Sequence, residues 1–151
     1  MPTHKTNIRN LTRPEMEELL HRHHVGRIAF LNDRRVDIEP ISYVFADGAL
    51  YGRAAPGTRT QALCCQPWVA LQVDDIRGPF DWESVVVKGT VYTVEPSQMS
   101  PLREHYEHAL RTIRTAMPDA LTEHDPAPQR TILFRLHIDE MEGRSARQRA
   151  A

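Results

Sequence analysis

The chain has 151 residues, 40% of them hydrophobic, and a net charge of −1 from 19 basic and 20 acidic side chains. This length suits one domain, and a domain of this size buries roughly 68–70% of its unfolded surface, enough for a core without disulfides or metals. The balanced charge gives no long-range attraction to nucleic acid or anionic lipid, and no apolar run approaches the roughly 18 residues of a membrane span. Neither a nucleic-acid partner nor a membrane partner is therefore expected.

The cysteine content argues against a secreted protein. The only two cysteines, Cys64 and Cys65, are adjacent, so a disulfide between them would be strained and would close almost no loop. Residues 1–10 contain no apolar core of a secretory signal. The chain is therefore expected in the reducing cytoplasm.

The first element is predicted to be a helix over residues 12–24. Thr12 can accept a hydrogen bond at the N-cap, Glu15 stands three residues later as a capping box requires, and Pro14 is tolerated in the first turn. Apolar residues follow at helical spacing and would pack against a core.

Extended runs then dominate the chain. Six of them are predicted to be strands: residues 25–31, 36–45, 49–53, 68–73, 82–94 and 131–138. The second and third runs meet at Asp47-Gly48, which is a hairpin signal because glycine accepts the positive φ of a tight turn. Gly89, inside the fifth run, indicates a β-bulge or a sharp bend.

The third predicted strand leads into the most informative local pattern of the chain. This pattern is Gly57-Thr58-Arg59-Thr60, and it begins a short helix that ends near Cys65. A helix N-terminus offers unpaired backbone N–H groups and a partial positive charge, and here hydroxyls and a guanidinium are added to it. The turn is therefore predicted to hold a phosphate group.

The second half of the chain completes the fold prediction. A long helix is predicted from Ser97 or Ser100 to Met117. The short links between strands favour antiparallel pairing, because parallel strands need long crossovers. The predicted class is mainly β (α+β): a six-stranded antiparallel barrel with flanking helices. Residues 1–141 would form this single domain, and residues 142–151 a flexible polar C-terminal tail.

Two groups of histidines are candidate metal ligands. His105 and His108 share one helix face at i, i+3, and a second group comprises His21, His23 and His24. Neither group has a convincing third ligand at short range, so no metal site is expected.

The order and spacing of seven short segments carry a family resemblance: residues 25–30, 40–43, 57–59, 66–70, 82–89, 134–138 and 143–144. With these segments the chain resembles the pyridoxamine 5′-phosphate oxidase-like superfamily of FMN-binding split barrels, and most of all its nitroimidazole-resistance-type branch. The resemblance implies a split barrel that forms a homodimer with two FMN sites at the subunit interface. It also implies a flavin-dependent oxidoreductase that reduces or oxidises a small-molecule substrate.

The resemblance further implies which residues bind the cofactor. A phosphate-binding group at and after the end of the third strand comprises Arg53, Thr58, Arg59 and Thr60. A ring-binding group on the second and fifth strands comprises Pro40, Ile41, Ser42, Tyr43, Trp82, Ser84 and Val85. The Pro-Ile-Ser-Tyr segment also fits flavin chemically, since it offers apolar contact together with hydroxyls and strand backbone groups. No catalytic acid, base or nucleophile is identified, and none is required, because flavin itself carries the redox chemistry.

Several alternatives stay open on this pattern. Relatives bind a deazaflavin coenzyme or haem in place of FMN, and a non-catalytic flavin-binding module would need no substrate-binding group. True pyridoxamine-phosphate oxidases hold their substrate with C-terminal Trp and Arg residues, whereas the only tryptophans here are Trp68 and Trp82. Oxidation of vitamin B6 is therefore not the expected activity.

Overall fold

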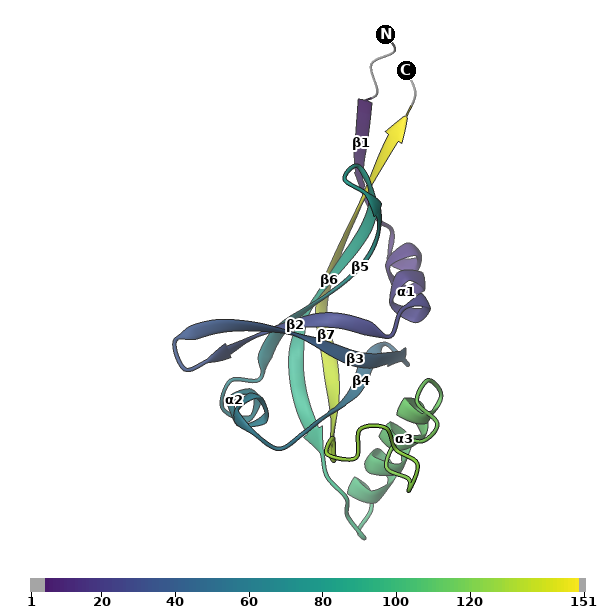
Figure 1. Cartoon of the computed structure of the whole chain (residues 1–151). Helices are drawn as coiled ribbons and strands as arrows, with labels where there is room; N and C mark the ends of the chain where they lie inside the picture. The colour runs from purple at the N-terminus through teal and green to yellow at the C-terminus, as the bar shows by residue number, and fades with distance from the viewer. Residues whose placement is uncertain (1–4, 150–151) are drawn as a thin grey trace.

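The structure is a computed structural model that describes residues 5–149 (Figure 1). Within these residues, seven strands and three helices follow one another: β1 Lys5–Asn10, α1 Arg13–Arg22, β2 Val25–Asn32, β3 Arg35–Ala46, β4 Ala49–Ala54, α2 Thr58–Cys65, β5 Trp68–Gly78, β6 Asp81–Val94, α3 Leu102–Arg114 and β7 Ile132–Arg149. None of the helices within this range is long and apolar enough to cross a membrane.

The strands close into a ring. Their order is β1-β7-β4-β3-β2-β5-β6, and β6 pairs again with β7, so the six strands β2 to β7 form a closed antiparallel barrel. These are the six strands expected from the sequence, and the predicted split-barrel class is confirmed. The seventh strand, β1, lies along the end of β7 and was not expected. All six of its side chains are exposed, so it lacks the apolar alternation by which a strand is recognised.

The barrel is filled by the inward-facing residues of every strand. Ile28, Leu71, Val87 and Leu136 are fully buried in one cluster, and burying each such side chain stabilises the fold by roughly 1.5–3 kcal/mol. Helix α1 closes one opening of the barrel, and its Leu20 belongs to the same cluster. A second, smaller core lies outside the ring, where α3 packs on β4 and β7.

Two predicted backbone features are confirmed. Asp47 and Gly48 have φ values of 52° and 72°, as a tight hairpin between β3 and β4 requires. The register of β6 on β7 shifts between Lys88 and Gly89. A Cβ atom at Gly89 would lie 2.0 Å from the carbonyl oxygen of His137, so this close backbone approach excludes any larger residue.

The expected flexible tail is wrong for residues 142–149. These residues continue β7, which pairs with β6 on one side and β1 on the other. Ala146 is buried, and Arg147 forms ion pairs with Asp81 (2.5 Å) and Glu83 (2.7 Å). Pairing on both edges therefore orders this polar segment, whereas residues 150–151 lie outside the described range.

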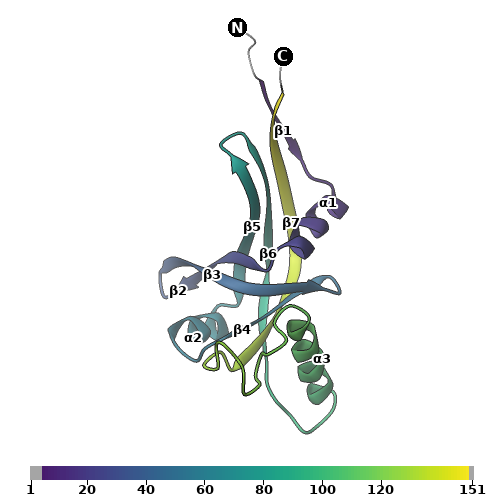
Figure 2. The ribbon, with the colours of Figure 1, turned by 45° about the vertical axis from the view of Figure 1, so that its right-hand side comes forward.

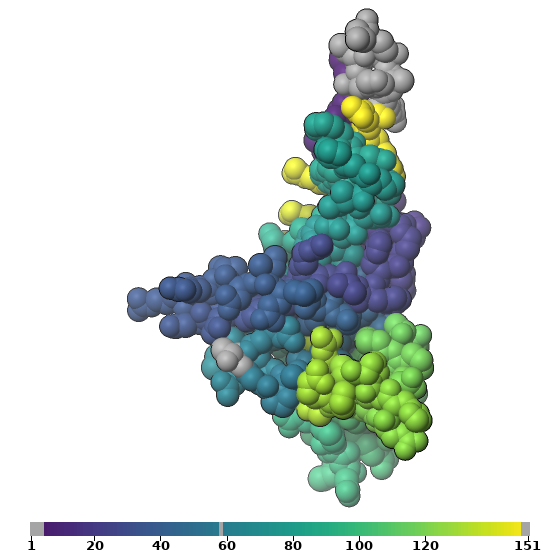
Figure 3. All heavy atoms as spheres, viewed as in Figure 1, coloured from purple at the N-terminus to yellow at the C-terminus, as the bar shows by residue number. Residues whose placement is uncertain are grey.

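The β5–β6 hairpin is also longer than predicted. The two strands were predicted over residues 68–73 and 82–94, but β5 continues to Gly78 and β6 begins at Asp81. Together with β1 and the end of β7, this hairpin forms an arm that extends beyond the barrel (Figure 1, Figure 2). The β2–β3 hairpin projects in a different direction, and both projections are visible on the molecular surface (Figure 3).

Candidate functional site

The turn between β4 and α2 has the backbone of an anion-binding site. Gly57 is the N-cap of α2 and provides no side-chain capping bond, so the first N–H groups of the helix stay available. Thr60 stabilises the turn by donating its hydroxyl to the carbonyl of Ala55 at 2.8 Å. Thr58 begins the helix, but its side chain lies outside the described part of the chain.

Arg59 brings a cation to this turn, and the fold gives it a partner. Its Nη1 atom donates to Oε2 of Glu39 on β3 at 2.5 Å, and the Arg59 side chain is 21% exposed. The partner carboxylate is more accessible, at 43% exposed. A phosphate bound at this turn would therefore contact a half-buried guanidinium that is already paired with one carboxylate.

Arg53 was expected beside the same phosphate, but the structure engages its guanidinium elsewhere. Its two terminal nitrogens donate to both carboxylate oxygens of Asp125, at 2.8 and 2.7 Å, and one of them also donates to the carbonyl of Ala127 at 2.7 Å. Both side chains of the pair are almost completely buried. The Arg53 guanidinium, aided by the backbone N–H groups of Ala127 and Leu121, holds the pKa of Asp125 well below its ordinary value. Arg53 thus anchors the loop after α3 to β4.

The four predicted ring-binding residues of β3 divide between two faces of the strand. Pro40 is exposed and Ser42 is half-buried, whereas Ile41 and Tyr43 point into the barrel core. The Tyr43 hydroxyl donates to the carbonyl of Leu20 at 2.8 Å, and burial raises its pKa. Only Pro40 and Ser42 therefore offer side chains to the outer face. Ser42 also lines a cavity of about 380 Å³ together with Arg53.

The predicted residues of β6 divide in the same way. Ser84 faces outward and accepts a hydrogen bond from the Gln72 amide at 3.0 Å, while Val85 is fully buried. Trp82 is half-buried in the arm, where β6 pairs with Ile76 of β5 and Ala146 of β7. Trp82 therefore belongs to the arm, and it lies far along β6 from the residues that pair with the start of β5.

A polar strip on this outer face was not recognised from the sequence. Arg27 of β2 donates to Asp74 of β5 at 3.3 Å, and the Gln72 amide donates to the same carboxylate at 2.9 Å and to Ser84. These residues occupy outward positions on three neighbouring strands. The signal was present as polar residues alternating with buried ones, but it becomes a cluster only once the strand order is known.

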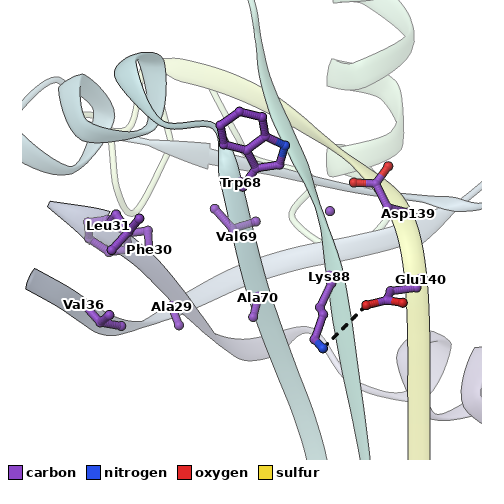
Figure 4. Close-up of a pocket in the computed structure, with 11 residues that line it drawn as sticks. Ala29, Phe30, Leu31, Val36, Trp68, Val69, Ala70, Lys88, Asp139 and Glu140 are labelled. Atoms are coloured by element: carbon purple, nitrogen blue, oxygen red, sulfur yellow. Dashed lines mark ion pairs between the residues drawn. The ribbon is translucent and has the colours of Figure 1, made fainter. Parts of the chain in front are cut away.

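An apolar pocket of about 440 Å³ lies directly beside this strip (Figure 4). Its outer walls include Val36 and Trp68, which are 70% and 69% exposed. The ion pair between Lys88 and Glu140, at 3.5 Å, borders it on β6 and β7. The register places the row containing Ala70 next to the row containing Gln72. The outer face therefore joins an apolar surface to hydrogen-bonding groups, an arrangement that suits a flat heterocycle.

Arg59 is bound to the same strand, β3, but from its other face. Glu39, the partner of Arg59, lies between the exposed Ile38 and Pro40 and alternates with them, on the side of the strand that carries Ile41 and Tyr43. Leu31, at the end of β2, lines the apolar pocket and also a smaller pocket against α2. Leu31 therefore links the apolar pocket to the middle and end of α2, where Gln61 and Cys65 line the smaller pocket.

Comparison with known proteins agrees with this architecture. The chain matches the model of the pyridoxamine 5′-phosphate oxidase family over residues 12–145. An uncharacterized protein of Rhizobium meliloti (strain 1021) is 28% identical, and the match covers 92% of this chain and 95% of that protein.

Solved structures share the fold. A protein from Mesorhizobium loti named as FAD-binding is 26% identical, with a TM-score of 0.73 over 93% of this chain and 99% of its own. A candidate 5-nitroimidazole antibiotic resistance protein from Bacteroides thetaiotaomicron is 17% identical, with a TM-score of 0.74 over 100% of this chain and 95% of its own. A FAD-binding protein from Mycobacterium smegmatis is 22% identical, with a TM-score of 0.66 over 91% of this chain and 98% of its own. The last two likenesses concern the fold alone.

Proposed function

This chain belongs to the pyridoxamine 5′-phosphate oxidase family, and from that premise we propose that it is a flavin-binding oxidoreductase that uses FMN and acts on a small molecule. One observation carries the proposal: the outer face joins an apolar pocket to a polar strip, and the cation at the start of α2 is bound to β3, a strand of the same sheet. Flavin needs these three environments for its ring, its pyrimidine edge and its phosphate.

The proposal gives each group of residues a task. Arg59 and the free N–H groups of α2 would hold the phosphate, since guanidinium and helix N-terminus both favour phosphate oxygens. Pro40 and Ser42 would contact the ring from β3, and Ser84 from β6. FMN would supply the transfer of a hydride or of single electrons. Arg53 takes no direct part in this scheme, because its guanidinium is already bound to Asp125.

The identity of the flavin is the finer part of the proposal. A phosphate site at Arg59 suits the terminal phosphate of FMN, whereas the names of two solved relatives point to FAD. A deazaflavin coenzyme and haem would use the same barrel. Mass spectrometry of whatever the purified protein releases separates all four, and a Soret band in its spectrum would identify haem.

We also propose that the protein acts as a cytoplasmic homodimer. Val36, Ile38 and Trp68 are 70%, 66% and 69% exposed on one face, and contiguous exposed apolar surface commonly marks an interface. The β2–β3 hairpin that carries two of these residues projects from the barrel (Figure 3). A second copy placed on this face would cover the apolar pocket and exclude water from a bound ring.

Titration of the purified chain with FMN tests the binding step. A shift of the flavin absorption bands and a change of its fluorescence are expected at stoichiometric amounts of protein. Absence of both changes would refute flavin binding. Stopped-flow oxidation of the reduced complex by nitroaromatic compounds and quinones then tests the oxidoreductase step. If no acceptor reacts faster than oxygen, the chain is a flavin-binding module without this activity.

A further inference from the structure

A separate cavity, of about 420 Å³, lies between α3 and the outer surface of β4, β6 and β7. Six residues line it: Tyr51, Tyr92, Val94, His105, His108 and Arg135. Its volume falls within the range of roughly 300–1,000 Å³ that is typical of small-molecule sites. None of these residues takes part in the proposed flavin site, so the cavity requires its own explanation.

Arg135 is the charged centre of this cavity. Its neighbours on β7, Phe134 and Leu136, are buried in the barrel core, so Arg135 faces outward beneath α3. Among residues 5–149, the half-buried Arg135 side chain forms no ion pair and no hydrogen bond. This contrasts with Arg53, two positions away on the neighbouring strand in register, whose guanidinium is fully satisfied by Asp125. A half-buried guanidinium without a counter-charge favours a carboxylate or a similar oxyanion.

Aromatic rings surround the guanidinium. The strand register pairs Arg135 with Tyr51 of β4 on one side and with Tyr92 of β6 on the other. His105 and His108 reach the cavity from one face of α3, and the rings of His108 and Tyr51 meet edge to face with centroids 5.6 Å apart. Four of the six lining residues thus present rings, which would contact a planar ligand.

One acidic side chain contacts the lining of this cavity. Asp47, in the β3–β4 turn, lies 3.3 Å from Nε2 of His108, and no ion pair joins it to Arg135 within residues 5–149. Within the described part of the chain, no three His, Cys, Asp or Glu side chains are grouped to hold a metal ion. The two imidazoles of α3 are therefore better explained as walls of an organic ligand site than as metal ligands.

We propose that this cavity binds a small aromatic carboxylate. Its carboxylate group would pair with Arg135 in the two-bond geometry that guanidinium favours, and its ring would lie among Tyr51, Tyr92 and His108. The hydroxyls of Tyr51 and Tyr92, which make no hydrogen bond within residues 5–149, would be available to polar substituents on the ring. This site is separate from the proposed flavin site and does not depend on it.

Titration of the full-length chain with benzoate, followed by two-dimensional NMR of backbone amides, tests the proposal. Amide shifts are expected in β4, β7 and α3, and benzoate should bind at least about tenfold more tightly than uncharged benzamide, since only benzoate can form charge-assisted bonds with the guanidinium. No binding of benzoate, or equal binding of benzamide, would overturn the proposal. Because the measurement needs no flavin, failure here leaves the flavin proposal untouched, and the reverse also holds.

Two variants and a control locate the site. Arg135→Gln should weaken benzoate binding about tenfold or more, and Tyr92→Ala, at a half-exposed position that tolerates change, should weaken it several-fold through loss of ring contact. Arg111→Gln removes a guanidinium from the exposed side of the same helix and should leave binding unchanged. Equal affinity of the Arg135→Gln and Arg111→Gln proteins would place benzoate elsewhere.

Discussion

Arg59, at the start of α2, donates a 2.5 Å hydrogen bond to Glu39 of β3, so the cation proposed to receive a phosphate is held by an internal carboxylate. The bond also joins α2 to the strand whose outer face carries Pro40 and Ser42. A phosphate that replaces Glu39 would therefore exchange one charge-assisted bond for another. Substitutions of Arg59 and of Glu39 should therefore have different effects on FMN binding.

The substitution Arg59→Ala should weaken FMN binding about ten- to a hundredfold, because one charge-assisted bond of about 1.5–3 kcal/mol is lost. Fluorescence titration with FMN measures the dissociation constant directly. Arg111→Ala is the matched control, since it removes an exposed arginine from α3. If Arg59→Ala binds FMN as well as the control does, the phosphate does not lie at this turn.

The substitution Glu39→Gln should have the opposite effect on FMN affinity. Removal of the competing carboxylate leaves the Arg59 guanidinium free for phosphate, and partly exposed ion pairs are worth only about 0.2–1 kcal/mol. FMN affinity should therefore rise modestly, by about two- to fivefold, and its dependence on salt concentration should steepen. A loss of affinity would instead indicate that Glu39 itself contacts the cofactor.

The substitution Trp68→Glu should dissociate the proposed homodimer. It places a charge on the apolar face that includes Val36 and Ile38, and burial of an unpaired charge at an interface is costly. Sedimentation velocity should show the mass of one chain where the unmodified protein shows two, with parallel loss of FMN affinity. Met99→Glu is the control, because Met99 is 75% exposed on the link before α3. Monomers in the unmodified protein would refute the dimer.

The substitution Arg53→Met should lower the melting temperature by about 10 °C, because it leaves the buried Asp125 carboxylate without its cation.

The ion pair between Arg53 and Asp125 also makes stability depend on pH. The pKa of Asp125 is lowered in the fold, so its contribution to stability is complete above the ordinary carboxyl value of about 3.9 and is lost as pH falls through the lower, folded value. Melting temperatures measured between neutral and strongly acid pH should show this loss in the unmodified protein and a smaller one in Arg53→Met. An identical acid dependence of the two proteins would contradict the assignment.

The substitution Gly89→Ala should destabilise the fold by about 1–3 kcal/mol or more, since its Cβ atom would lie 2.0 Å from the His137 carbonyl oxygen. Chemical denaturation measures the change in the free energy of unfolding. Gly78→Ala provides the control, because a Cβ atom there meets nothing within 4 Å. Equal stability of the two variants would show that the bulge relaxes without cost.

Local signals in the sequence predicted the fold well. The Thr12 and Glu15 capping box forms as expected at the start of α1, and the Asp47-Gly48 turn joins β3 to β4. These features depend on residues a few positions apart, so their physics is contained in short segments. The strand β1 and the end of β7 were missed because they are ordered mainly by pairing with each other and with β6, which no local pattern encodes.

The candidate site was predictable only in part. The start of α2 after Gly57 was predicted correctly, because its signals are close together in sequence, whereas phosphate binding at Arg59 stays a prediction. The true partner of Arg53 is Asp125, 72 residues later, and nothing near Arg53 indicates it. Strand alternation also decides that Tyr43 faces the core while Ser42 faces out, and this assignment requires knowing which face of β3 is buried.

The bulge at Gly89 has a consequence for both faces of β7. Lys88 is opposite Glu140 and Gly89 is opposite Ile138, so Asp139 is a supernumerary residue in the ladder. Inserting one residue inverts the in-and-out parity of everything before it on that strand. Without Asp139, Leu136 would point to solvent and Arg135 would point into the hydrophobic core. A single extra amino acid therefore lets one continuous ribbon present correctly oriented side chains at both ends of the molecule.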